Sequence, residues 1–458
     1  MRARLLSSGI VAILVVGAGA VLQTRVGPEG SPPPEPVSAE TGAWFCPHGG
    51  LWKTWVTVGN PGVETATVRL STFGSEGMAA LEAFELAGGE QRYVPVPTPN
   101  AGAGTMVEFF GSEVAAGWVS EGGGGVAAES CRGSAGRSWY VADGITELTS
   151  GGSERRSWLI VMNPFAVDAA FDVTLLTAEG APTRVGELRG YVLKAHRSVA
   201  FNLNRFLLGE ISVAAAVNAT LGSVSVSQLG STEGVGIRAV TAVPHPARRW
   251  VFPSALGADD SALVVADPRE ESAAFSVRQQ GPEEQRPVEA LTEESLRGLS
   301  VQTYEISSEP GPSGIVVEAN GEIPVVAARR TAGRKGDVGG TSGASSVASS
   351  WVVPPTVPPE GGGQQRLLIE NPGLQDITVH VRLFGDADAD LGTIQVPAGR
   401  TVAVGLDEPS DGAPAWVSVE SEDGTFVAGS ASLSLEGAAY ALSIGLPSGA
   451  ERVDSPES

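Results

Sequence analysis

The chain has 458 residues, of which 42% are hydrophobic and 18% charged, so it can bury the cores of several domains. Its formal net charge of −22 and its lack of a basic stripe argue against binding to nucleic-acid phosphates or anionic lipid headgroups. Sixty glycines and 31 prolines indicate many turns, but they are too few for a disordered composition.

Residues 1–26 are typical of a secretory signal peptide or a transmembrane anchor helix. Two arginines precede an apolar run from Ile10 to Leu22, and this run contains a candidate AGA cleavage motif. The proline-rich residues 27–40 then predict an extended spacer. We therefore expect an extracytoplasmic protein, either secreted to the cell wall or held at the cell membrane by this single N-terminal segment.

The two cysteines, Cys46 and Cys131, lie near the two ends of the first of four repeats. An even number of cysteines in an exported protein favours a disulfide bond between them. Two buried free thiols or a metal pair are the alternatives, and only His48 lies nearby as a further ligand. We expect the disulfide.

The repeat is marked by a tryptophan and by an Asn-Pro or Asp-Pro pair, and successive prolines of these pairs are 103, 104 and 104 residues apart. The landmarks are Trp44, Asn60 and Pro61; Trp139, Asn163 and Pro164; Trp250, Asp267 and Pro268; and Trp351, Asn371 and Pro372. Proline presets the turn dihedral and the Asn or Asp side chain bonds the backbone ahead of it, so each pair predicts a turn between two strands. We expect the tryptophans to be core anchors.

Strands are predicted in every repeat, and most clearly in the last one. Its segments RLLIE, ITVHVRLF, TIQVP, TVAVGL and AWVSVES alternate between apolar and polar residues and are separated by turn signals. About seven short strands per repeat predict an all-β chain, a tandem array of about four immunoglobulin-like or fibronectin-III-like β-sandwich modules. The alternative is a β-propeller with about two four-stranded blades per repeat.

The expected boundaries follow from this pattern. The modules are residues 41–136, 137–247, 248–332 and 350–447, with a linker at 333–349 and a disordered tail at 448–458. Residues 202–210 and 291–299 are expected to form short helical turns within loops.

Motifs that carry chemistry are scarce in this sequence. The four histidines are far apart, and the chain has neither a nucleophile elbow nor a phosphate-binding loop. Asp386, Asp388 and Asp390 alternate in one turn and are weak calcium candidates, with a solvated acidic hairpin tip as the alternative. The arginine pairs, at 155–156, 248–249 and 329–330, are expected at the surface near strand ends. We expect no enzyme activity, no catalytic residues and no cofactor.

The anchor-like start, the proline-rich spacer, the WFCP segment at 44–47, the Asn-Pro turns and the preference for arginine over lysine together resemble exported or membrane-anchored all-β proteins of unknown function from actinobacteria. The resemblance implies a cell-envelope location and brings no activity or site residues. We expect a non-enzymatic structural or interaction role, with envelope proteins or cell-wall polysaccharide as partners. One alternative is a carbohydrate-binding or adhesive ectodomain with Trp52, Trp55 and Trp118 as exposed aromatic residues, and another is an envelope enzyme.

Overall fold

The computed structural model describes residues 40–97, 102–147, 154–180, 182–183, 185–253, 260–307, 311–332, 338–360, 363–408, 410–434 and 440–448. Contacts divide the chain into a unit Met1–Pro34 and a unit Glu35–Ser458, and the fold below is that of the second unit. The predicted signal or anchor, the spacer up to residue 39 and the tail after Ser448 lie outside the described residues. Within the described part, no residue belongs to an α-helix, and no helix could span a membrane.

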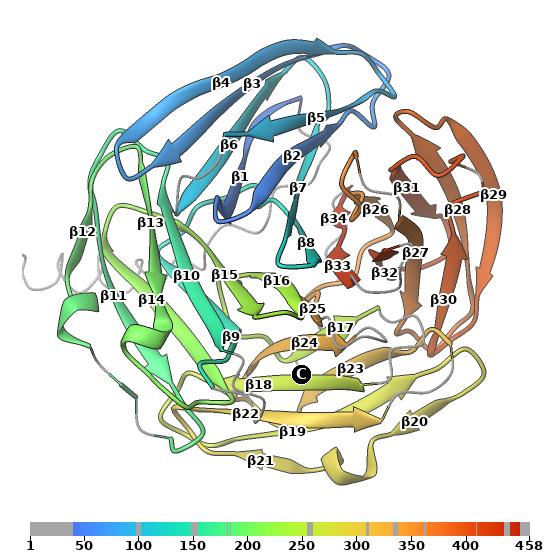
Figure 1. The fold of residues 1–458 in the computed structure, drawn as a ribbon. Coiled ribbons are helices and arrows are strands. Elements are labelled where there is room, and N and C mark those ends of the chain that lie inside the picture. The colour runs from blue at the N-terminus through green and yellow to red at the C-terminus, as the bar shows by residue number, and fades with distance from the viewer. Residues whose placement is uncertain are drawn as a thin grey trace, which may run out of the picture. The chain divides into compact units, whose positions relative to one another are not determined.

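Strands follow one another in four groups along the chain, and each group is a module (Figure 1). Module 1 contains β1 (Thr41–Gly49), β2 (Lys53–Gly59), β3 (Ala66–Gly74), β4 (Gly77–Leu86), β5 (Gln91–Val96), β6 (Ala103–Phe110), β7 (Ala115–Gly122) and β8 (Gly125–Ser130). Module 2 contains β9 (Ser138–Gly144), β10 (Arg155–Asn163), β11 (Ala169–Leu176), η1 (Gly186–Leu188), β12 (Tyr191–Leu193), β13 (Arg197–Asn202), η2 (Leu203–Arg205), β14 (Val213–Leu221), β15 (Ser225–Thr232) and β16 (Gly236–Thr241).

The second half of the chain repeats this organisation. Module 3 contains β17 (Arg249–Phe252), β18 (Asp260–Asp267), β19 (Ala273–Gln280), β20 (Gln285–Pro287), η3 (Glu289–Leu291), β21 (Glu294–Leu296), β22 (Ser300–Ser307), β23 (Gly314–Ala319), β24 (Val326–Ala332) and β25 (Val338–Ser342). Module 4 contains β26 (Ser350–Val353), β27 (Gly363–Asn371), β28 (Ile377–Phe384), β29 (Ala389–Val396), β30 (Arg400–Gly405), β31 (Trp416–Ser421), β32 (Val427–Ser434), β33 (Tyr440–Ile444) and β34 (Leu446–Pro447).

Each module consists of two antiparallel sheets that face each other across a hydrophobic core. We call the sheet that contains the first strand the W sheet, since this strand carries the landmark tryptophan. The W sheets have the orders β1-β6-β3-β4, β12-β11-β14-β9, β17-β23-β19-β20 (with β21 also on β19) and β29-β28-β31-β26-β34. The NP sheets contain the strand that ends at the Asn-Pro or Asp-Pro pair, and their orders are β5-β2-β7-β8, β13-β10-β15-β16, β22-β18-β24-β25 and β30-β27-β32-β33.

The prediction of an all-β tandem array of two-sheet modules is confirmed. The propeller alternative correctly anticipated two sheets of about four strands per repeat. Successive strands of a propeller blade are neighbours in the sheet, however, whereas the strands of each module here alternate between its two sheets, as in a sandwich. The eight sheets nevertheless close into a cycle, as propeller blades do (Figure 1).

Two loop predictions differ from the structure. The segment 333–349, expected as a linker, contains β25, which pairs with β24 inside the NP sheet of module 3. Its small residues fit the crowded centre of the unit, where β25 contacts β16 and β33. The predicted helical turn at 291–299 is the 3-10 turn η3 followed by β21, and the turn at 202–210 is limited to the 3-10 turn η2.

All four landmark tryptophans lie in the module cores, and each indole N–H donates to a backbone carbonyl. The acceptors of Trp44, Trp139, Trp250 and Trp351 are the carbonyl oxygens of Val114, Val224, Val325 and Phe426, at 2.7, 2.6, 2.8 and 2.8 Å. A buried indole needs such a partner for its only polar atom. The repeated tryptophan therefore fixes the same contact in every module.

The asparagine of the Asn-Pro pair does more than form a turn. In module 4, Asn371 accepts from the N–H of Gly373 at 3.0 Å, as the turn requires. Its amide also donates to the carbonyl oxygens of Gln375 and Val396, at 2.8 and 3.0 Å. Because Val396 ends β29 in the W sheet, this side chain links the two sheets of the module. Asn60 makes the equivalent bond to Leu86, and Asn163 makes it to Leu193.

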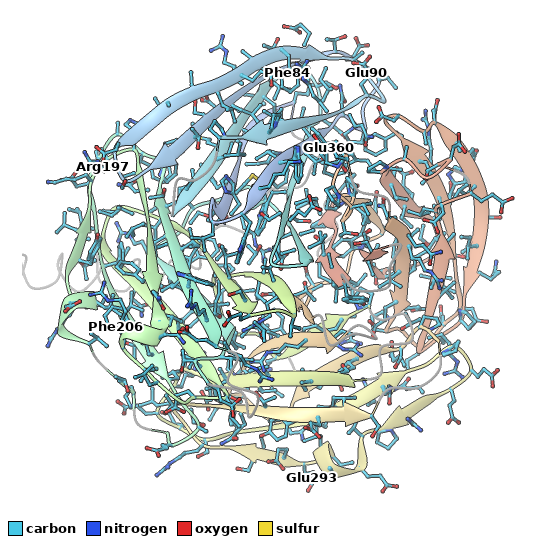
Figure 2. The ribbon with its side chains drawn as sticks, in the orientation of Figure 1. Phe84, Glu90, Arg197, Phe206, Glu293 and Glu360 are labelled. Atoms are coloured by element: carbon cyan, nitrogen blue, oxygen red, sulfur yellow. A yellow bond between two sulfur atoms is a disulfide. The ribbon has the colours of Figure 1, made fainter. Side chains whose placement is uncertain are left out.

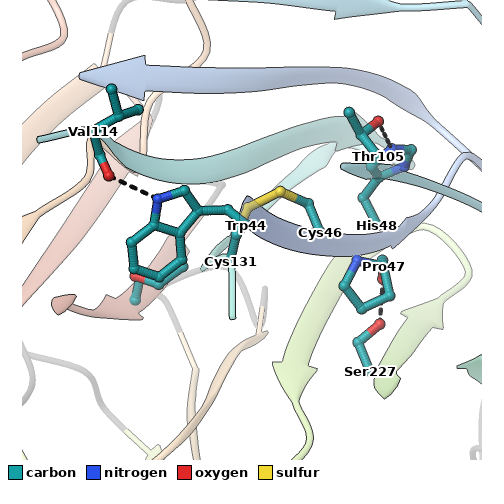
Figure 3. The surroundings of a disulfide bond; sticks show 10 residues. Trp44, Cys46, Pro47, His48, Thr105, Val114, Cys131 and Ser227 are labelled. Carbon is teal, nitrogen blue, oxygen red and sulfur yellow. Dashed lines mark hydrogen bonds between the residues drawn. A yellow bond between two sulfur atoms is a disulfide. The ribbon is translucent and has the colours of Figure 1, made fainter. Parts of the chain in front are cut away.

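The predicted disulfide is confirmed, and it joins β1 to the segment that follows β8 (Figure 3). Cys46 and Cys131 are both buried, with their Cα atoms 4.6 Å apart. Next to them, the Nε2 atom of His48 lies 2.9 Å from the hydroxyl of Thr105. Burial lowers the pKa of His48 to about 3, so this histidine is a neutral core residue.

The modules pack against one another. The W sheet of each module packs on the NP sheet of the next module. Ser198 of module 2 donates to the carbonyl of Phe73 in module 1 at 2.7 Å. Arg330 of module 3 pairs with Asp143 of module 2, and the N–H of Gly314 in module 3 donates to Thr401 of module 4 at 3.0 Å. Four seams result, and the fourth joins module 4 back to module 1.

The closing seam contains the indole N–H of Trp416, which donates to the hydroxyl of Thr57 at 3.0 Å. On the same seam, Lys53 of module 1 pairs with Glu360, which Figure 2 shows beside the strands of module 1. At the centre, the last strands of the four NP sheets contact one another in the order β8, β16, β25, β33 and back to β8. The unit is therefore a closed cycle of eight face-packed sheets.

A size-matched pair of residues lies at each seam. One member is the residue directly before the Asn-Pro or Asp-Pro pair of one module. The other lies in the W sheet of the preceding module, three residues before the valine that pairs with the landmark tryptophan. A Cβ on Gly104 would lie 2.6 Å from the sulfur of Met162, and one on Gly59 would lie 2.8 Å from the ring of Trp416. The other two pairs are Ala266 with Ala214, which share one core cluster, and Glu370 with Gly314.

Candidate functional site

A cleft of about 830 Å³ opens at the closing seam between modules 4 and 1. One wall is the W sheet of module 4, and Glu113, in the loop between β6 and β7, comes from module 1. The lining consists of acidic and hydroxyl side chains with one histidine: Glu113, Ser349, Ser350, Thr378, His380, Thr393, Glu420, Ser421, Glu422, Asp423 and Ser448.

The cleft forms because the face of this sheet changes character along its strands. Trp416 and Phe384 lie at one end, are almost fully buried, and pack into the core of module 1 with ring centroids 6.1 Å apart. Residues i, i+2 and i+4 of a strand share one face. Glu420, four residues after Trp416, and His380, four residues before Phe384, therefore lie on the same face as the two aromatic rings. Both of these polar residues are exposed. The two modules thus pack tightly at the aromatic end and leave space at the polar end.

Negative charge accumulates in this space. Burial raises the pKa of Glu113, and the nearby carboxylates of Glu420 and Glu40 raise it further. Glu113, Glu420 and Glu422 form no ion pair with any other described residue. The one cation-forming side chain in the lining, His380, lies 2.8 Å from Asp390 through its Nε2 atom. The cleft therefore attracts positive charge.

Module 3 shows how the same position is neutralised elsewhere in the chain. Glu318 pairs across strands with Arg249 and Ser276, and Glu420 pairs in the same register with Ser350 and His380. Glu318 lies 2.8 Å from Arg278 and 3.6 Å from Arg249. In module 4, a serine stands where module 3 has Arg249.

The module 4 residue that corresponds to Arg278 is an arginine, but it is paired with a different carboxylate. Arg382 of module 4 corresponds in register to Arg278, but it lies 3.2 Å from Asp388 in the adjacent turn. The guanidinium groups that neutralise Glu318 thus have no free counterpart at Glu420 among the described residues.

Two of the three calcium candidates, Asp386 and Asp388, lie in the turn between β28 and β29, and Asp390 lies in β29. Asp388 pairs with Arg382, while Asp390 accepts from the N–H of Gly392 at 2.8 Å and contacts His380. That N–H, followed by His380, lowers the pKa of Asp390. Among the described residues, no group of three or more His, Cys, Asp or Glu side chains could hold a metal ion.

The tryptophans named for a carbohydrate-binding surface do not form one. Trp55 and Trp118 are only 3% and 1% exposed, so the prediction that they are exposed is wrong. Trp52 is partly buried and packs edge-on against Trp158, with ring centroids 5.9 Å apart. These side chains fill the module cores and the seam between modules 1 and 2.

The arginine pair at 329–330 is buried, so its predicted place at the surface is wrong. Asp143 of module 2 binds Arg330 and also Arg238, whose Nε atom lies 2.8 Å from the carboxylate. Nearby, burial raises the pKa of Glu129 to about 8, against the opposing effect of Arg132. An Arg-Arg pair inside an otherwise alternating strand was the available signal, since one of two adjacent strand residues must face inward.

Comparisons with known proteins give a family but no activity, and no curated protein matches the chain. A glycoside hydrolase family 32 structure from Bifidobacterium adolescentis is 9% identical, covers 90% of this chain and 96% of its own, and has a TM-score of 0.15. A Streptomyces avermitilis alpha-L-rhamnosidase complexed with L-rhamnose is 10% identical, with 88% and 57% coverage and a TM-score of 0.15. Two B repeat units of the Staphylococcus aureus collagen binding protein are 7% identical, with 86% and 100% coverage and a TM-score of 0.10.

Likenesses this weak carry no argument about this chain. The family model is different, since it matches residues 98–358, which is more than half of the sequence. The chain belongs to DUF5719, a family of unknown function.

Proposed function

We propose that this chain is a non-enzymatic, extracytoplasmic scaffold that holds an envelope protein by a cationic side chain seated in the cleft between modules 4 and 1. The observation that carries the proposal is the pair of unneutralised carboxylates, Glu113 and Glu420, which line the cleft from two different modules. The buried disulfide supports an oxidising location, and the apolar N-terminal sequence supports export.

The chemistry of the ligand follows from module 3. There Arg249 and Arg278 place guanidinium groups beside Glu318, and Ser350 leaves the corresponding space beside Glu420 open. A lysine or arginine side chain of a partner would restore that arrangement and would also neutralise Glu113. The hydroxyls of Thr378 and Thr393 on the same wall can accept further hydrogen bonds from such a group.

The test is a calorimetric titration of the full-length chain with an arginine-containing tripeptide and with a tripeptide that has glutamine in its place. We expect the arginine peptide to bind and its affinity to fall with salt, because the attraction is between charges near the surface. Glu113→Gln and Glu420→Gln should each weaken binding about tenfold, as loss of a charge-assisted hydrogen bond does. Glu305→Gln, an exposed change on β22 of module 3, is the matched control.

Equal affinity of the wild type and both cleft variants would contradict the proposal. So would equal binding of the glutamine peptide, because the cleft would then not select for charge.

A further inference from the structure

The seam between modules 3 and 4 has polar side chains where the other three seams have apolar ones. Met162, Ala266 and Trp416 fill their seams with hydrocarbon or an aromatic ring. At the corresponding place, module 4 has Glu370, which is fully buried against Gly314 of module 3. A carboxyl group in this position needs a partner, since an unsatisfied buried polar group is costly.

Four residues meet at this point, two from each module. Glu370 and Thr401 are cross-strand neighbours on β27 and β30, and Gly314 and Gln280 are cross-strand neighbours on β23 and β19. Cross-strand neighbours share a face of the sheet, so Gln280 points to the side on which Gly314 meets Glu370. A Cβ on Gly314 would lie 2.4 Å from the carboxyl carbon of Glu370 and 2.4 Å from the hydroxyl of Thr401. The glycine therefore leaves room for the carboxyl group of Glu370 and the hydroxyl of Thr401.

Four of the polar atoms around this space have no hydrogen-bond partner among the described residues. They are both carboxyl oxygens of Glu370 and both side-chain amide atoms of Gln280. Gln280 is only 1% exposed, and Glu370 is not exposed at all. Buried polar atoms without protein partners on two facing sheets are the usual mark of a small polar molecule that bridges them.

Charge decides which molecule fits. Burial raises the pKa of Glu370 well above its usual value, although Arg329 and Arg249 act in the opposite direction. These arginines are the charged groups that face Glu370 from β24 and β17, while Thr401 and Gln280 face it as neutral groups, and Tyr440 acts on Arg329. The arginines disfavour a bound cation, and the carboxyl group disfavours an anion. A neutral molecule that both donates and accepts hydrogen bonds remains.

We infer that the seam between modules 3 and 4 encloses one or more ordered water molecules, which bridge the carboxyl group of Glu370 to the amide of Gln280. Glu370 takes the place that Met162 fills in the seam between modules 1 and 2, and the water satisfies its carboxyl group. These water-mediated bonds add to the direct bond from the N–H of Gly314 to the hydroxyl of Thr401, and protonation of Glu370 makes the stability of the seam depend on pH.

A crystal structure of the full-length chain at high resolution tests the site directly. We expect density for water within hydrogen-bond distance of both Glu370 and Gln280, without the short coordination distances of a metal ion. Direct contact between the two side chains with no density between them would overturn the inference, and so would an ion at the site.

Urea unfolding as a function of pH tests the proton independently. A carboxyl group whose pKa is raised in the folded state stays protonated after the unfolded chain has ionised, so stability falls as pH rises above the unfolded value of about 4.3. Relative to Glu370→Gln, the wild type should lose about tenfold in its folding equilibrium constant per pH unit until the folded pKa is reached. Glu305→Gln should show no such difference from the wild type.

An identical pH dependence of wild type and Glu370→Gln would overturn the inference, because Glu370 would then be ionised in the folded state. Gly314→Ala supplies a further measurement. Its methyl group would meet the carboxyl group of Glu370 and the hydroxyl of Thr401, so this variant should lower the urea midpoint and displace the water density.

Discussion

Modules 1 and 3 have the same two-sheet architecture but satisfy their buried polar groups very differently. In module 1 a disulfide links the first strand to the segment after the last strand. The side chain of Asn60 both accepts and donates hydrogen bonds, and Gly59 packs against the ring of Trp416. In module 3 the residue at the corresponding position is Asp267, and one of its carboxyl oxygens has no partner among the described residues. The seam that module 3 forms with module 4 is the polar one at Glu370. The repeat thus fixes where contacts occur, and individual substitutions decide how strong they are.

The largest expected effect is at the seam that closes the cycle on module 1. Trp416→Ala removes a fully buried ring from between two modules, and we expect the free energy of unfolding to fall by about 3–5 kcal/mol. Urea denaturation measures this, with Trp52→Ala as a control at a partly buried tryptophan. Gly59→Leu in the Trp416→Ala background should recover part of the loss by refilling the space. A loss below about 1 kcal/mol would mean that this seam does not hold the unit together.

The disulfide provides the next test of the strength of module 1. Replacing Cys46 and Cys131 together by serine opens a loop of 85 residues and should lower the free energy of unfolding by about 4 kcal/mol in the chain-entropy model. The wild type in reducing buffer should unfold at the same urea concentration as the double variant. If the reduced and oxidised wild-type proteins unfold alike, the disulfide does not contribute to the difference between modules 1 and 3.

The landmark asparagine can be used to make module 1 resemble module 3. In Asn60→Asp, an acceptor replaces the amide that donates to the carbonyls of Glu64 and Leu86 at 2.8 and 3.0 Å. We expect a loss of about 2–3 kcal/mol, because one buried and one partly buried carbonyl lose their donor. The turn bond from Gly62 can persist, since either side chain accepts it. A loss no larger than the ~1 kcal/mol of a turn bond alone would show that the link between the sheets is weak.

The sequence predicted the parts of this molecule that depend on local pattern. Alternation and turn signals indicated the strands, a constant spacing indicated the modules, and the two cysteines indicated the disulfide. The packing of Trp416 on Gly59 could not be predicted, because it joins residues more than 350 positions apart through a seam that no local pattern encodes. The same holds for the cleft, where Glu113 and Glu420 approach only after the cycle has closed. Burial of Arg329 and Arg330 was missed because the centre of the unit is built from all four modules.

The substitution Asp267→Asn makes module 3 resemble module 1 at the landmark position. Asp267 accepts from the N–H of Arg269 at 3.0 Å, and burial raises the pKa of its carboxyl group above the ordinary value. A raised folded pKa means that the contribution of this group is most favourable below the unfolded pKa of about 3.9 and is lost as pH rises through the folded value. Asp267→Asn restores the donor found in the other modules and removes the charge. We expect it to raise the free energy of unfolding at neutral pH by about 1 kcal/mol, with a gain that shrinks as the pH is lowered toward 4. Thermal or urea unfolding at both pH values measures this. A variant that is no more stable than the wild type at pH 7 would show that module 3 has adapted its turn to the aspartate, and the landmark position would then not account for the difference between the two modules.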